Sequence, residues 1–75
     1  MFVKIRLKVG DYLELNNLAS IKILGMRPAA KQEYIGQDIL KFSVDRTRDY
    51  LFVCDEKSYN IPGEQIVFIE FPNNQ

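Results

Sequence analysis

The sequence contains no histidine, and Cys54 is the one cysteine among its 75 residues. A Ser-His-Asp or Cys-His nucleophilic site is therefore excluded within this chain. A single cysteine also excludes an internal disulfide and a Cys/His metal site within one subunit. Carboxylate pairs remain available for acid–base chemistry, but no part of the sequence marks a pocket to hold them. We expect a protein that is not an enzyme, with no catalytic residue, no metal site and no cofactor.

The chain also lacks a long apolar segment. Its first ten residues, MFVKIRLKVG, include charges at three alternate positions, so we expect neither the core of a signal peptide nor a transmembrane span here. A free cysteine without a secretory segment favours a reducing, cytoplasmic location and no membrane association. Because Cys54 follows the apolar Leu51-Phe52-Val53, we expect its thiol to be buried and inert.

An excess of charge of one sign is absent too, since ten basic and ten acidic residues give a net charge of zero. The charges are unevenly spread: residues 1–33 hold six basic and three acidic side chains, whereas residues 34–75 hold four basic and seven acidic ones. The length allows one small domain, residues 1–75, near the lower limit for a stable core. Oligomerisation often stabilises domains of this size, and opposite patches can meet between subunits. We therefore expect a homo-oligomer.

Residues 59–71, YNIPGEQIVFIEF, carry the strongest structural signal. A turn at residues 61–63 leads into a strand in which five of the six residues 66–71 are apolar. Alternation along a strand places Ile66 and Phe68 on one face and Val67, Ile69 and Phe71 on the other. Both faces then need cover, which so short a chain can hardly supply. We expect a closed barrel, a subunit interface formed by these five residues, or both.

The rest of the chain reads as short antiparallel strands. Residues 2–9 place Val3, Ile5, Leu7 and Val9 on one face, and Asn16-Asn17 predicts a tight hairpin turn. Further strands are expected at 12–15, 18–26, 38–44 and 50–54, the 38–44 strand with Leu40, Phe42 and Val44 inward. Residues 28–36 suit a short helix, near 28–34, or a loop. The pattern predicts an all-β fold, a small antiparallel barrel of five or six short strands.

A basic stripe on the first strand is the sharpest functional feature. Lys4, Arg6 and Lys8 alternate with the apolar positions, and Lys22 extends the stripe if the strands pair in that register. Cations on a strand can follow a phosphate backbone, and nearby Phe2 or Tyr12 can stack a base. These four basic residues are the predicted RNA contacts of a translational regulator. The alternative is a solvated strand face that discourages edge aggregation.

A second basic feature is the segment Asp45-Arg46-Thr47-Arg48-Asp49. Two arginines on a turn can grip a phosphate group, although the aspartates compete for the same guanidinium groups. The alternative function is therefore an oligomeric inhibitor or sequestering protein that takes a small anionic or nucleotide ligand, or a protein partner, at subunit junctions. Its predicted ligand-binding residues are Arg46, Arg48, Tyr50 and Tyr59. Such a compact binder suits a phage-encoded viral factor as well as a cellular regulator.

Two stretches resemble known families. Residues 3–26, with KVGDYLEL followed by IKILGM, resemble the carbon storage regulator family of RNA-binding translational regulators. That resemblance implies an RNA-binding dimer with interlaced strands, and Lys8 matches a basic position of the family's RNA-contacting strand. Separately, residues 59–71 look like the closing strands of Sm-like and other SH3-like barrels, which often read I-P-x-x-x-I-x-x-I-E. The second resemblance implies a barrel and no particular function.

Overall fold

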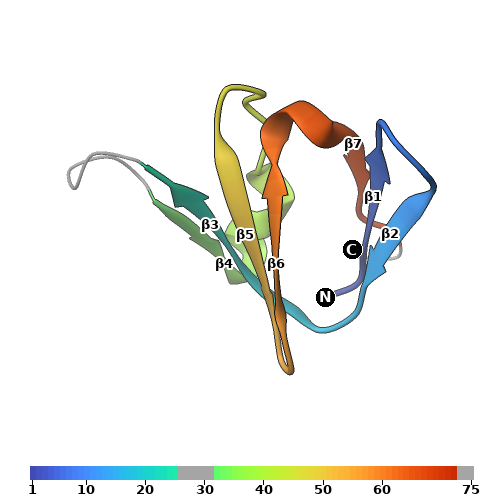
Figure 1. Ribbon diagram of the computed structural model, residues 1–75. Coiled ribbons are helices and arrows are strands. Elements are labelled where there is room, and N and C mark those ends of the chain that lie inside the picture. Colours follow the sequence, from blue (N-terminus) through green and yellow to red (C-terminus); the bar gives the residue numbers. More distant parts are fainter. Residues whose placement is uncertain (26–31, 73–75) are drawn as a thin grey trace.

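The strands of the protein form two antiparallel sheets, seen in the computed structural model of Figure 1, which describes residues 1–25 and 32–72. The three-stranded sheet has the order β2-β1-β7 and the four-stranded sheet the order β4-β3-β5-β6. The bounds are β1 (Val3–Leu7), β2 (Tyr12–Leu15), β3 (Leu18–Leu24), β4 (Glu33–Ile35), β5 (Asp49–Cys54), β6 (Ser58–Pro62) and β7 (Ile66–Glu70). Two 3₁₀ helices, η1 (Gly36–Lys41) and η2 (Gly63–Gln65), complete the described elements. The all-β prediction is confirmed, with seven described strands instead of five or six.

One hydrophobic core lies between the two sheets. The strand residues that reach it are mainly β-branched and aromatic, which suits the pleated surface of a sheet. Its most deeply buried side chains come from both sheets and from η1: Val3, Ile5, Leu15, Ile21, Ile39, Tyr50, Phe52 and Ile66. The expected barrel therefore takes the form of two sheets enclosing one core.

The turn between β2 and β3 joins the two sheets in the lower part of Figure 1, above the tip of the β5–β6 hairpin. Asn17 has a φ of 58°, the left-handed conformation that asparagine tolerates better than most residues. Directly after it, the backbone N–H of Leu18 donates to the carbonyl of Met1 at 2.8 Å. The asparagine turn was predicted, but it connects strands of different sheets, so it does not form a simple hairpin.

The alternation of inward and outward side chains predicted for residues 2–9 holds within β1, which ends at Leu7. Val3 and Ile5 are fully buried and Leu7 packs against the core, while Lys4 and Arg6 point outward. Because β1 ends at Leu7, Val9 lies in the following turn and is 79% exposed. Its predicted inward position is wrong.

The predicted strand at 38–44 is also wrong. Residues 36–41 form η1, whose geometry has three residues per turn. Ile39 and Phe42 are three positions apart, so both face the core, and the N–H of Phe42 donates to the Ile39 carbonyl at 3.1 Å. Of the helix considered near 28–34, residues 28–31 lie outside the described part of the chain, and Glu33–Ile35 is strand β4.

A β-bulge in β7 changes which of its side chains face outward. Ile69 pairs with Ile5 and Phe68 with Arg6, but the next residue of β1, Leu7, pairs with Ile66. Val67 is therefore the extra residue that shifts the alternation by one position. Ile66 and Ile69 face the core, whereas Val67 and Phe68 are about equally exposed. The predicted pairing of Ile66 with Phe68 on one face is wrong for this reason.

Candidate functional site

The outer face of the three-stranded sheet carries a row of side chains from three strands. Tyr12 of β2 lies opposite Arg6 of β1, and Arg6 lies opposite Phe68 of β7. Directly opposed residues in antiparallel strands are close enough for their side chains to interact. We call this set the Tyr12–Arg6–Phe68 row.

The side chains of this row contact one another while staying accessible to solvent. The Tyr12 and Phe68 rings meet edge to face, with centroids 6.0 Å apart and planes inclined by 66°. The cations of Arg6 and Lys4 lie 5.3 Å and 5.1 Å from the centre of the Tyr12 ring. Tyr12 is 40% exposed and Phe68 41% exposed. The surface is therefore an ordered aromatic and cationic patch that can accept a flat or anionic ligand.

The next row along the same face has a different charge. Lys4 lies between Glu14 of β2 and Glu70 of β7, so this row carries two carboxylates and one ammonium group. On the other side, Lys8 follows the end of β1, with its backbone N–H donating to the Gln65 carbonyl at 2.9 Å. Positive charge therefore does not extend uniformly along β1, because Lys4 lies between two carboxylates.

Lys22 lies apart from the other predicted RNA contacts. It belongs to β3 in the four-stranded sheet, where its cross-strand neighbours are Glu33 and Leu51. The register that would have extended the basic stripe is absent because β1 pairs with β2 and β7. The structure brings Lys4 and Arg6 together at Tyr12 and leaves Lys22 on another surface.

The segment 45–49 is organised by its own hydrogen bonds. The Asp45 carboxylate accepts from the backbone N–H of Thr47 at 2.9 Å and from its hydroxyl at 2.6 Å. The Tyr50 hydroxyl accepts from the Asp45 N–H at 2.8 Å and donates to the Asp45 carbonyl at 3.2 Å. Tyr50 is only 1% exposed, so it supports this turn from the core and offers no surface to a ligand.

The four residues predicted to bind a small anion do not form one site. Arg46 donates from Nη2 to the Val67 carbonyl at 3.0 Å, and Arg48 extends from the exposed turn. Tyr59 lies on β6 beside Lys57, whose ammonium is 5.9 Å from the ring centre. Because Tyr50 is buried, it cannot contact a ligand together with the other three residues. Binding of a small anion or nucleotide at subunit junctions stays a prediction.

The hydrogen bonds of Thr47 should make the Asp45 carboxyl group unusually acidic. The Thr47 hydroxyl, then its N–H, hold the pKa of Asp45 below its ordinary value, and the nearby Arg48 guanidinium acts in the same direction. A lowered folded-state pKa stabilises the fold above the ordinary carboxyl pKa, and this stabilisation is lost as pH falls through the folded value. An NMR titration of Asp45 should show the low midpoint, and Thr47→Val should raise it; an unchanged midpoint in the variant would contradict this assignment.

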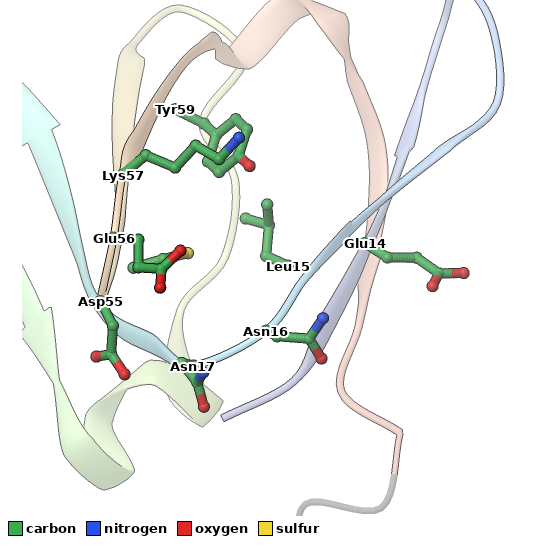
Figure 2. Close-up of a pocket in the computed structure, with 9 residues that line it drawn as sticks. Glu14, Leu15, Asn16, Asn17, Asp55, Glu56, Lys57 and Tyr59 are labelled. Carbon is green, nitrogen blue, oxygen red and sulfur yellow. The ribbon is translucent and has the colours of Figure 1, made fainter.

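A shallow groove lies at the end of the molecule where β2 turns into β3 and β5 turns into β6, shown in Figure 2. Its volume is about 240 Å³, and its lining is Glu14, Leu15, Asn16, Asn17, Cys54, Asp55, Glu56, Lys57 and Tyr59. Cys54, expected to be buried, is half-buried and lines this groove. Burial, followed by the charge of Asp55, raises the pKa of its thiol. Within residues 1–25 and 32–72, no group of three or more Cys, Asp or Glu side chains is arranged to hold a metal ion.

The predicted subunit interface separates into core and surface residues. Ile66 is completely buried within its own chain, and Ile69 and Phe71 pack against the core. Val67 and Phe68 are the members left exposed, at 40% and 41%. Association through this strand stays a prediction, with these two side chains as its contacts. The contact between Phe68 and Tyr12 depends on the bulge at Val67, which regular alternation along the strand does not predict.

Comparison of the chain with protein-family models, with curated proteins and with solved structures gave no match in any of the three searches. In the part of the chain that the structure describes, no helix is both long and apolar enough to cross a membrane. The functional interpretation therefore depends on the geometry of the surface itself.

Proposed function

We propose that the protein is a non-catalytic binding module for single-stranded RNA, which it contacts through the outer face of β2, β1 and β7. The observation that carries this proposal is the Tyr12–Arg6–Phe68 row, in which two exposed rings and a cation occupy neighbouring strands. Aromatic side chains on a sheet offer stacking surfaces for bases, and cations beside them attract phosphates.

The angle between the two rings favours a single strand over a duplex. The ring planes of Tyr12 and Phe68 are inclined by 66°. Bases stacked on both rings would be steeply inclined to each other, which an unpaired strand permits and the parallel stack of a double helix does not. The contact between the rings reduces the side-chain freedom that would be lost when a ligand binds.

Replacing Tyr12 with alanine should weaken RNA binding by about 5- to 150-fold, the range that corresponds to the loss of one base–aromatic stack. Arg6→Ala should weaken binding as well and reduce its dependence on salt. The measurement is fluorescence anisotropy of a labelled single-stranded oligouridylate, with titrations at several salt concentrations. Lys22→Ala is the matched control, because Lys22 is an exposed cation on the other sheet. This variant should bind the oligouridylate with the affinity of the wild type.

Three results would contradict the proposal. The first is wild-type protein without measurable affinity for the single strand, and the second is a Tyr12→Ala variant with wild-type affinity. The third is a wild-type protein that has no affinity for RNA but binds a protein partner, with that interaction abolished by Tyr12→Ala. The carboxylates of Glu14 and Glu70 on this face make that third outcome worth testing, since a mixed charge pattern also suits protein interfaces.

A further inference from the structure

The charges on the outer face restrict the path that an RNA backbone can take. A strand running along β1 would pass Lys4, where the Glu14 and Glu70 carboxylates lie on the two neighbouring strands. Neighbouring strands are about 4.8 Å apart, so both carboxylates are within a Debye length of a phosphate at Lys4. The row therefore carries a net charge of −1, which weakens the attraction of its single lysine for a phosphate. The Tyr12–Arg6–Phe68 row has no carboxylate and one guanidinium group, so a path across the strands is electrostatically preferred.

Arg46 stands at one end of that path. Its Nη2 atom donates to the carbonyl of Val67, the bulged residue directly before Phe68, at 3.0 Å. β7 is an edge strand of the sheet, so this contact fixes a guanidinium group at the sheet edge beside the Phe68 position. A guanidinium group has five N–H donors, and the hydrogen bond to Val67 uses one of them. The others can bind a phosphate without releasing the carbonyl.

Arg48 provides an internal comparison on the same turn. Its backbone carbonyl accepts from the Gly63 N–H at 2.7 Å, and its side chain lies near enough to Asp45 to lower the pKa of that carboxyl group. Its charge is therefore partly balanced by a carboxylate, while the Arg46 guanidinium is directed to β7. Of the two arginines on this exposed turn, Arg46 therefore contacts the edge of the three-stranded sheet, whereas Arg48 lies near Asp45.

Taking the RNA-binding function above as its basis, we propose that Arg46 is a phosphate-binding residue of this face. The RNA strand then crosses β2, β1 and β7 in that order or its reverse, stacks bases on Tyr12 and Phe68, and places a phosphate at the edge of β7. The juxtaposition of Arg46 with the bulge at Val67 specifies this end of the path.

The test compares Arg46→Ala with Arg48→Ala, using the labelled single-stranded oligouridylate and a series of salt concentrations. Loss of one phosphate contact should lower the salt slope by about 0.7 and weaken binding about fivefold at 0.1 M salt. We expect this change for Arg46→Ala and wild-type behaviour for Arg48→Ala. Arg46→Lys keeps the charge and should restore the slope. Equal effects of the two alanine variants, or no effect of either, would overturn the inference.

Two controls separate this inference from the function on which it depends. Thermal unfolding of Arg46→Ala checks that loss of the exposed hydrogen bond to Val67 leaves the fold intact. If Arg6→Ala and Tyr12→Ala weaken binding while Arg46→Ala does not, RNA binding stands and the proposed path is wrong. If all three variants bind as the wild type does, the binding function itself is wrong.

Discussion

Phe42→Ala is expected to lower the free energy of unfolding by about 3–5 kcal/mol, the usual cost of truncating a buried phenylalanine. Phe42 is 8% exposed and contacts three other rings edge to face. Its centroid lies 5.3 Å from that of Tyr34, 5.0 Å from Tyr50 and 6.3 Å from Phe52. The substitution removes all three contacts and leaves a cavity between η1 and the four-stranded sheet.

The size of this loss matters because small domains have little stability in reserve. A loss of about 4 kcal/mol would remove a large part of the roughly 5–15 kcal/mol that is typical of folded domains. Urea denaturation followed by circular dichroism measures the change, and Phe68→Ala is the matched control. Phe68 is 41% exposed, so the same truncation there should cost much less. Similar losses at both positions would contradict the assignment of Phe42 to the core.

Gly63→Ala is expected to lower the free energy of unfolding by about 2–4 kcal/mol, combining overpacking with a weakened hydrogen bond. Gly63 is buried, and an added Cβ atom would lie 2.5 Å from the Asp45 carbonyl oxygen and 2.6 Å from that of Arg48. Both obstacles are backbone atoms, so a side-chain rotation cannot relieve the clash. The glycine is required because another segment of backbone approaches it closely.

The same substitution should also disturb the position of Arg46. The Gly63 N–H donates to the Arg48 carbonyl at 2.7 Å, and the turn that carries both arginines must move if a methyl group is inserted. Denaturant unfolding gives the stability change, and chemical shifts of residues 45–48 report the displacement. Glu64→Ala is the control, because the neighbouring Glu64 side chain is exposed. If Gly63→Ala were as stable as the wild type, the backbone of residues 45–48 would not approach Gly63 as closely as described.

The fold class could be predicted because local alternation decides it. Val3 and Ile5 face the core and Lys4 and Arg6 face outward, as a period of two requires. The strand predicted at 38–44 is wrong because Leu40, Phe42 and Val44 alternate as they would in a strand, while the buried pair, Ile39 and Phe42, follows the three-residue period of η1. Both periods fit the same few residues, and only tertiary packing distinguishes them.

The sequence predicts which cations of the candidate site face outward, but it does not predict which side chains lie next to one another across the strands. Lys4 and Arg6 followed from the alternation of one strand, and Tyr12 was recognised as a neighbour that could stack a base. Regular alternation places Phe68 on the same face as Ile66, because nothing in the sequence marks the bulge at Val67. Lys22 was misplaced because strand pairing is a long-range property that local patterns do not specify.

The pairing of β1 with β7 has a consequence for how the protein is made. β1 is the central strand of its sheet and pairs with β7, the last described strand. During synthesis β7 therefore leaves the ribosome long after β1 does. Contacts between segments so distant in sequence form late and slow the folding reaction. During synthesis the strand that bears Lys4 and Arg6 therefore keeps one edge unpaired, and the outer face of the three-stranded sheet is completed only after β7 has been made.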